Sequence, residues 1–182
     1  MDAIVFDKDN TLTAPYESVI HPLAVRGLES AQSVFGSNRV AVLSNSAGTK
    51  DDVGYRDALA IEQSLGMDVI RHDEKKPGGM QEVLDHFSLT DPTRLCVVGD
   101  RLLTDVVFGN LHGMLTVHTL PLCRGLDNQR DNKIAKAVRR IENGFLYNTR
   151  AGQWLQRTKT IPHKHWNGQD SLILQDESKD QG

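Results

Sequence analysis

The chain has 182 residues, of which 38% are hydrophobic and 25% are charged, and its formal net charge is −3. These values are typical of one globular domain with its own core, and they exclude a disordered chain, a collagen-like chain and a disulfide-stapled miniprotein. Cys96 and Cys123 are too few for a disulfide framework and lack neighbouring ligands for a zinc site.

Short runs rich in Val and Ile alternate along the chain with longer stretches of helical period. This alternation is typical of a parallel sheet covered by helices. The predicted strands are residues 3–6, 39–43, 67–70, 95–98 and 115–118. The predicted helices or helical turns lie between them, at residues 23–35, 52–65, 79–87 and 104–111. The sequence therefore predicts an α/β fold, a Rossmann-like three-layer sandwich with a central parallel sheet.

Polar side chains follow four of these strands at the point where each strand ends. They are Asp7, Ser44, the pair Arg71 and His72, and Asp100. In an open α/β sheet, ligands bind outside the carboxyl ends of the strands. We therefore expect these side chains to share one site.

The first strand leads directly into Asp7-Lys8-Asp9-Asn10. Alternate residues of an extended segment share a side, so Asp7 and Asp9 are placed where one carboxylate can attack and the other can transfer a proton. Asn10 tolerates a left-handed backbone conformation, which allows a sharp turn after the pair. Two nearby aspartates alone are more often a solvated acidic loop, so this interpretation depends on the rest of the chain.

Three further features follow in order along the chain. Ser44 and Asn45 come after the second strand, where a hydroxyl can donate to a phosphate oxygen. Lys76, held before a proline, can neutralise phosphate charge. Asp100 and Asp105 follow the fourth strand, and carboxylates are among the ligands that Mg²⁺ prefers. Each feature is weak by itself, but their joint order indicates phosphoryl chemistry.

In that order, residues 3 to about 118 resemble the haloacid-dehalogenase-like (HAD-like) phosphatase superfamily, with its D-x-D-x-T motif, Ser or Thr, Lys and G-D-x(4)-D. The resemblance implies that Asp7 is a nucleophile that forms an aspartyl-phosphate. It implies that Asp9 protonates the leaving group and then activates water. Ser44, with Asn45 beside it, and Lys76 would hold the phosphoryl group, and Lys75 is the alternative lysine.

The resemblance also implies a Mg²⁺ cofactor and a reaction class. Asp7, the backbone carbonyl of Asp9 and Asp100 would bind the ion, and Asp105 would be a further ligand or an orienting residue. Relatives that pump ions or cleave carbon–halogen bonds lack an aspartate at the position of Asp9, so a phosphohydrolase is favoured.

The spacing of the motifs leaves no room for a large cap domain. Asp7 and Ser44 are 37 residues apart, and Ser44 and Lys76 are 32 residues apart, and each interval is largely used by one helix and one strand. We therefore expect residues 1–123 to form a capless HAD-like catalytic core. An open site of this kind suits a phosphate displayed on a surface.

Longer strings around the four motifs resemble the eukaryotic mitochondrial phosphatidylglycerophosphate phosphatases. The resemblance implies hydrolysis of phosphatidylglycerophosphate to phosphatidylglycerol, the precursor of cardiolipin, at the matrix side of the mitochondrial inner membrane, and a plastid is the other location. Arg71 and His72 are candidates for contact with the diester phosphate of this lipid. The family has residues ahead of the first strand, whereas this sequence has essentially none there. An alternative reading is a capless phosphatase for a phosphoprotein, a nucleic-acid end or a soluble phosphomonoester.

Residues 124–164 differ from the rest in charge, with ten Lys or Arg against three Asp or Glu. Ile134, Val138, Ile141 and Phe145 recur at helical spacing, which predicts a basic amphipathic helix that can lie peripherally on an anionic membrane. A helix packed on the sheet with a solvated basic face is the alternative. Residues 165–182 are predicted to be a disordered tail. The expected partner is an anionic phospholipid, nucleic acid is not expected, and a homo-oligomer stays open.

Overall fold

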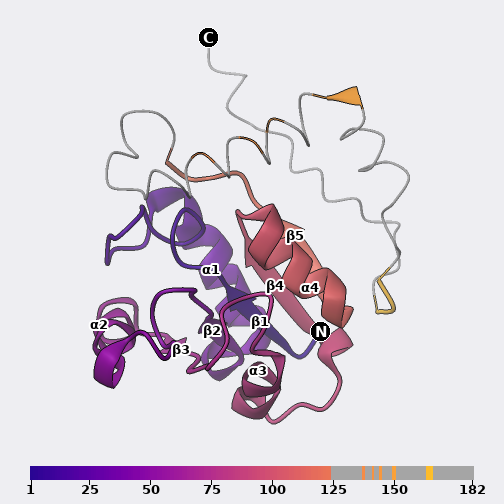
Figure 1. Ribbon diagram of the computed structural model, residues 1–182, viewed down its shortest axis with the longest axis horizontal. Helices are drawn as coiled ribbons and strands as arrows, with labels where there is room; N and C mark the ends of the chain where they lie inside the picture. The colour runs from indigo at the N-terminus through magenta and orange to yellow at the C-terminus, as the bar shows by residue number, and fades with distance from the viewer. Residues whose placement is uncertain (124–136, 138–140, 142–143, 145–148, 151–162, 166–182) are drawn as a thin grey trace.

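The computed structural model describes residues 1–123 together with 137, 141, 144, 149–150 and 163–165, and Figure 1 shows the path of the chain. Most of the predicted basic helix, and all of the predicted tail except residue 165, lie outside the described residues. None of the helices in the described ranges has the length and apolar character needed to span a bilayer.

A five-stranded parallel sheet forms the centre of the fold, with strand order β3-β2-β1-β4-β5. Its strands are β1 (Ala3–Phe6), β2 (Val40–Val42), β3 (Asp68–Val69), β4 (Leu95–Gly99) and β5 (Leu115–His118). Every residue of β1, β2 and β4 is buried, as expected for strands covered on both faces. The predicted strands are all present, and β3 is the shortest, at the free edge of the sheet.

Among residues 1–123, four α-helices cover the sheet: α1 (Pro22–Phe35), α2 (Arg56–Leu65), α3 (Met80–Phe87) and α4 (Val107–His112). Leu28 of α1 and Ile61 of α2 pack in one core cluster, whereas Phe87 of α3 and Phe108 of α4 pack in another. Strand β1 contributes to both clusters, because alternate side chains point to opposite faces. The helices α1 and α2 therefore cover one face of the sheet and α3 and α4 cover the other (Figure 1), which confirms the predicted three-layer sandwich.

Two predicted helices begin later than the sequence pattern indicates. Residues 53–55 form a separate 3-10 turn before α2, because Gly54 and Tyr55 both adopt positive φ angles, of 67° and 54°. Residues Leu102–Val106 form a π-helical turn before α4. The segments that follow β1 and β2 each contain one α-helix and short turns, so no large cap domain is inserted there.

Candidate active site

Three buried carboxylates meet beyond the carboxyl ends of β1 and β4. Asp7 directly follows β1, and its backbone N–H donates to the Val98 carbonyl at 2.8 Å, which extends the sheet contact by one residue. One carboxylate oxygen from each of Asp7, Asp100 and Asp105 lies within 4.8 Å of the others. The neighbouring strands thus bring together acids that are nearly 100 residues apart in the sequence. We call Asp7, Asp100, Asp105 and the lysine described next the catalytic cluster.

Lys76 supplies the positive charge of the catalytic cluster. Its Nζ lies 2.8 Å from Asp7 Oδ1 and 2.5 Å from Asp105 Oδ1, and its side chain is 1% exposed. Burial alone would lower the pKa of Lys76, but the carboxylates of Asp105 and Asp7 outweigh that effect and raise it above its usual value. Lys75, the alternative lysine, pairs with Asp51 at the surface instead.

The catalytic cluster contains three carboxylates and one lysine, so its acidic groups outnumber its basic group. Burial raises the pKa of Asp7 and the negative charge of Asp105 raises it further, while the positive charges of Lys76 and Arg101 act in the opposite direction. Several buried acids so close together are costly unless a positive charge compensates them. A set of hard oxygen donors with surplus negative charge fits a divalent cation such as Mg²⁺.

The chain after β4 is shaped to hold the carboxylate of Asp105 in place. The π-helical turn returns Asp105 toward the sheet, and its Oδ2 accepts a hydrogen bond from the Arg101 backbone N–H at 3.1 Å. A Cβ at Gly99 would lie 2.3 Å from Asp105 Cγ. Position 99 must therefore be glycine for this approach.

Asp9 lies in the turn that follows β1 and is not one of the three clustered carboxylates. Its Oδ1 accepts from Lys8 Nζ at 2.8 Å and from the Tyr16 backbone N–H at 3.1 Å. Asn10 adopts a φ of 64°, which confirms the left-handed turn expected from the sequence. The structure thus gives the two aspartates different surroundings, a buried one for Asp7 and a half-exposed one for Asp9.

The loop after β2 joins the site through Asn45. Its Oδ1 accepts the Lys76 backbone N–H at 2.7 Å, which fixes the start of the lysine segment. Ser44 is buried, and its Oγ lies 3.1 Å from Ser46 Oγ and accepts from the backbone N–H of Ser46 at 3.3 Å and of Ala47 at 3.4 Å. The Ser44 side chain thus orders the backbone of this loop, and the Asn45 side chain ties the loop to the Lys76 segment.

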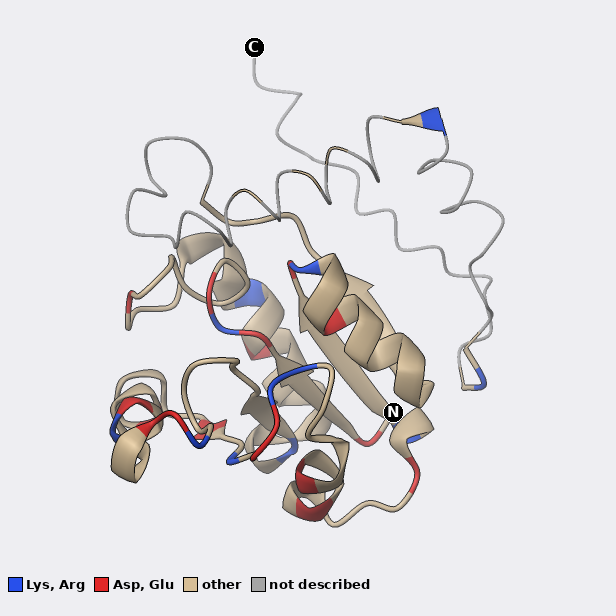
Figure 2. Cartoon of the chain, in the orientation of Figure 1, with Lys and Arg blue, Asp and Glu red and all other residues tan. Residues whose placement is uncertain are grey.

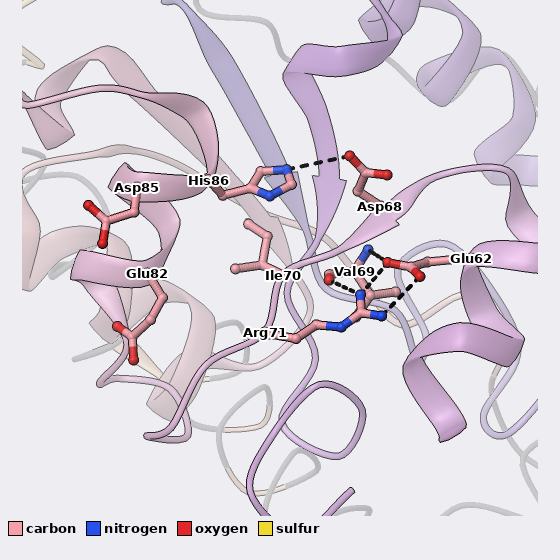
Figure 3. Close-up of a pocket in the computed structure, with 8 residues that line it drawn as sticks. All are labelled: Glu62, Asp68, Val69, Ile70, Arg71, Glu82, Asp85 and His86. Atoms are coloured by element: carbon pink, nitrogen blue, oxygen red, sulfur yellow. Dashed lines mark hydrogen bonds and ion pairs between the residues drawn. The ribbon is translucent and has the colours of Figure 1, made fainter. Parts of the chain in front are cut away.

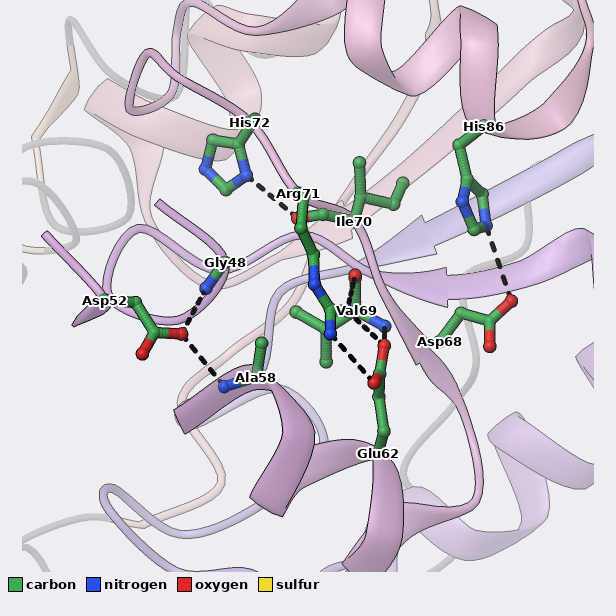
Figure 4. A network of polar contacts seen from close by, with 10 residues as sticks. All are labelled: Gly48, Asp52, Ala58, Glu62, Asp68, Val69, Ile70, Arg71, His72 and His86. Atoms are coloured by element: carbon green, nitrogen blue, oxygen red, sulfur yellow. Dashed lines mark hydrogen bonds and ion pairs between the residues drawn. The ribbon is translucent and has the colours of Figure 1, made fainter. Parts of the chain in front are cut away.

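Asp52 anchors the far end of that loop, a role that the sequence analysis missed. Its carboxylate accepts backbone N–H bonds from Gly48 at 2.9 Å and from Ala58 at 3.0 Å (Figure 4). It also accepts the Asp57 backbone N–H at 3.0 Å. Burial tends to raise the pKa of Asp52, but these three bonds outweigh it and lower the pKa. An aspartate just before a helical stretch is a common N-cap, and that signal was present in the sequence.

The structure does not bring Arg71 into the catalytic cluster. Its guanidinium binds both carboxylate oxygens of Glu62 and the Val69 carbonyl (Figure 4). It also lies 5.5 Å from the ring centroid of Tyr55. The sequence analysis named Arg71 as a candidate for substrate contact and did not foresee its partner Glu62, which comes from a different element, α2. Arg71 is thus bound to protein groups at the edge of the sheet.

His72 is buried just beyond Arg71. Its Nδ1 lies 3.0 Å from the Ile70 carbonyl oxygen (Figure 4). Burial lowers the pKa of His72, and the positive charge of Lys76 lowers it further. The imidazole is therefore near enough to the catalytic cluster to respond to its charge, while its Nδ1 contacts the protein backbone.

A separate hollow of about 390 Å³ opens at the free edge of β3, between α2 and α3, and we call it the β3-edge pocket (Figure 3). It is lined by Glu62, Asp68, Val69, Ile70, Arg71, Glu82, Asp85 and His86. Besides the Glu62–Arg71 pair, His86 Nε2 lies 3.7 Å from Asp68 Oδ2. None of the residues of the catalytic cluster lines this pocket.

Acidic and basic residues alternate along the loops at the carboxyl edge of the sheet (Figure 2). Lys8 pairs with Asp9, Lys50 with Asp73 and Lys75 with Asp51. In the described ranges this edge is therefore mixed in charge. The strongly basic part of the sequence, residues 124–164, lies mostly outside them.

Comparison with known proteins shows the family. The family model described as mitochondrial PGP phosphatase matches residues 1–122. Phosphatidylglycerophosphate phosphatase 1, chloroplastic/mitochondrial, of Arabidopsis thaliana is 44% identical over 163 residues, which are 88% of this chain and 44% of that protein. The mitochondrial phosphatidylglycerophosphatase of Saccharomyces cerevisiae is 38% identical over 115 residues, which are 61% of this chain and 62% of that protein.

The chain spans less than two thirds of the length of these two relatives. A crystal structure of an uncharacterized protein from Listeria monocytogenes serotype 4b has a TM-score of 0.50 and 18% identity, and covers 69% of this chain and 84% of that one. At that identity the likeness concerns the fold, and it supports the α/β architecture described above.

Proposed function

We propose that this chain, which belongs to the mitochondrial phosphatidylglycerophosphate phosphatase family, hydrolyses the terminal phosphate of phosphatidylglycerophosphate to give phosphatidylglycerol and phosphate. The catalytic cluster is the observation that carries this proposal. It places a candidate nucleophile, Asp7, in contact with a buried lysine and beside two further carboxylates. The substrate in the family's name then identifies the lipid on which this chemistry is proposed to act.

In the proposed reaction, Asp7 is the nucleophile and Asp9 transfers protons. A carboxylate oxygen of Asp7 attacks the terminal phosphorus, the bond from phosphorus to the glycerol oxygen breaks, and Asp9 gives that oxygen its proton. The product is an aspartyl-phosphate on Asp7. Asp9 then takes a proton from water, which attacks the phosphorus, and the bond to Asp7 breaks to release phosphate. The half-exposed position of Asp9 supports this exchange of protons with water.

The residues of the catalytic cluster fit Mg²⁺. Asp7, the Asp9 backbone carbonyl and Asp100 would hold the ion, with Asp105 as a further ligand or an orienting residue. When bound, it would offset the negative charge of the phosphoryl oxygens. The donor set supports this proposal because it consists of buried hard oxygens with surplus negative charge.

Lys76 and Ser44 would bind the phosphoryl oxygens and stabilise the negative charge that the metal ion does not offset. The Lys76 ammonium lies against Asp7 and is held there by Asp105, so it is already beside the reacting oxygen before substrate arrives. A preorganised charge costs little reorganisation during the reaction. Asp105 thereby has a proposed orienting role, which its hydrogen bond to the Arg101 backbone supports.

The setting of the reaction is also proposed. The relatives are named mitochondrial or chloroplastic. We infer that the chain acts as a peripheral protein on an organelle membrane, with the matrix side of the mitochondrial inner membrane as the first candidate. The ten Lys or Arg of residues 124–164 would supply attraction to anionic lipid there, at about 1 kcal/mol for each basic residue close to the surface.

A phosphate-release assay tests the proposed function. Wild-type protein and the Asp7→Asn variant would be compared on phosphatidylglycerophosphate in mixed micelles and on soluble phosphomonoesters, with and without Mg²⁺. We expect Mg²⁺-dependent release from the lipid by wild type alone. Vigorous hydrolysis of a soluble ester without release from the lipid would instead favour the alternative capless phosphatase.

A further inference from the structure

Arg101 is a cation at the catalytic cluster for which the motifs provide no role. It follows Asp100 directly, and its backbone N–H donates to Asp105 at 3.1 Å, so its backbone is fixed beside two proposed metal ligands. The side chain is half-buried, and its positive charge acts on Asp7. The guanidinium is therefore within electrostatic reach of the proposed nucleophile.

The environment of this guanidinium differs from that of other arginines in the described part of the chain. Arg71 binds Glu62, Arg94 binds Asp2, and Arg39 donates to the Phe87 carbonyl. In contrast, Arg101 Nε is shut off from solvent and meets no acceptor among the described residues. A buried donor without an acceptor is costly, and an incoming anion would supply the missing partner.

The phosphoryl group under attack does not require this cation, because Lys76, Ser44 and the proposed Mg²⁺ already address its oxygens. Phosphatidylglycerophosphate carries a second anionic group, a phosphodiester, on the other side of a three-carbon glycerol. The planar fork of a guanidinium matches two phosphate oxygens at once. We propose that Arg101 binds this phosphodiester and selects substrates that carry it, an inference that rests on the proposed function.

The strand order of the sheet indicates on which side of Asp7 the phosphodiester would bind. Ser44 and Arg71 follow β2 and β3 on one side of β1, whereas Arg101 follows β4 on the other side. The sequence analysis named Arg71 and His72 as candidates for contact with the diester phosphate, but Glu62 already binds the Arg71 guanidinium. The phosphodiester therefore lies on the β4 side of Asp7 in this proposal.

Kinetics on two soluble substrates test the role of Arg101. Glycerophosphoglycerol phosphate, the deacylated form of the lipid, has both phosphates, whereas glycerol 3-phosphate has only the monoester. We expect Arg101→Gln to raise KM for the first about 10- to 100-fold with little change in kcat, and to lower kcat/KM for the second by a much smaller factor. Arg101→Lys should raise the first KM less, because it keeps the charge but loses the fork.

Arg26→Gln is the matched control, because it removes one positive charge from an exposed position on α1. It should leave KM for both substrates unchanged. Thermal unfolding of each variant checks the fold, and Arg101→Lys carries the test if Arg101→Gln is unstable. Equal losses on both substrates, or no change on either, would overturn the role of Arg101 while wild-type activity on the lipid leaves the proposed function intact. If the wild-type protein acts on neither phosphatidylglycerophosphate nor its deacylated form, both the role of Arg101 and the proposed function are overturned.

Discussion

The catalytic cluster and the β3-edge pocket both gather acidic and basic side chains, and acids outnumber bases in both, yet they differ in burial. The four residues of the catalytic cluster, backbone included, are each at most 9% exposed, and acids outnumber the base. In the pocket, Asp68 has a 65% exposed side chain, and Glu62 is matched by Arg71. A buried surplus of one charge indicates a functional site better than a hollow does.

The contacts of the β3-edge pocket indicate a structural role. Glu62 accepts the Val69 backbone N–H at 2.9 Å, and Arg71 donates to the Val69 carbonyl. These groups belong to the two-residue strand β3 at the free edge of the sheet. An unpaired sheet edge is a template for association with another chain, and a side-chain pair that occupies its backbone groups reduces that exposure. The charges of this pocket are therefore used within the fold.

Asp7→Asn should have the largest effect, and only on activity. The amide cannot act as the nucleophile, so we expect phosphate release to fall by on the order of 10³-fold or more. Circular dichroism should show an unchanged fold. Glu62→Gln makes the same chemical change in the β3-edge pocket and should leave the rate unchanged. Full turnover by Asp7→Asn would contradict the assignment of Asp7 as the nucleophile. The catalytic cluster would then be no better a candidate for the active site than the β3-edge pocket.

Lys76→Met should affect both activity and stability. It would leave Asp7 and Asp105 buried without their cation, and breaking a buried pair in this way costs about 3–5 kcal/mol. The free energy of unfolding, measured with denaturant in the absence of Mg²⁺, would report this loss. Lys75→Met is the matched control. Its ammonium pairs with Asp51 at the surface, so its loss should cost at most about 1 kcal/mol.

Mg²⁺ should stabilise the folded protein through the catalytic cluster. A ligand that binds only the folded state at 100 times its Kd stabilises it by about 2.7 kcal/mol. We therefore expect the melting temperature of metal-free protein to rise on titration with Mg²⁺. Asp100→Asn removes one of the three clustered carboxylates and should weaken the rise. An equal rise in this variant would place the ion elsewhere.

Glu62→Gln should have the smallest effect, confined to stability. The hydrogen bond from Arg71 lowers the pKa of Glu62 in the folded state, although burial opposes this. The pair therefore contributes fully above the usual glutamate pKa of 4.5, and its contribution is lost as the pH falls through the lower pKa of the folded state. We expect a loss of about 1 kcal/mol at pH 7 that shrinks under acid conditions. A loss independent of pH would indicate that packing, not charge, matters here.

Much of the fold and part of the site could be predicted from local patterns. The apolar runs identified all five strands, and the polar residue after β1 and the one after β4 marked Asp7 and Asp100 as neighbours. These predictions succeed because parallel strands align their carboxyl ends whatever the intervening loops do. The separate turn at Gly54 and Tyr55 was missed, since positive φ angles there follow from local packing that periodicity does not encode.

By itself, the sequence determined the chemistry available to this protein: two aspartates after β1, a lysine, and two aspartates after β4, in the order of a phosphatase family. Only the tertiary structure decided that Lys76 is buried against Asp7 while Lys75 faces solvent, and that Glu62 binds Arg71. Strand ends are fixed by short-range alternation of side chains, but ion pairs between distant segments depend on how loops and helices pack.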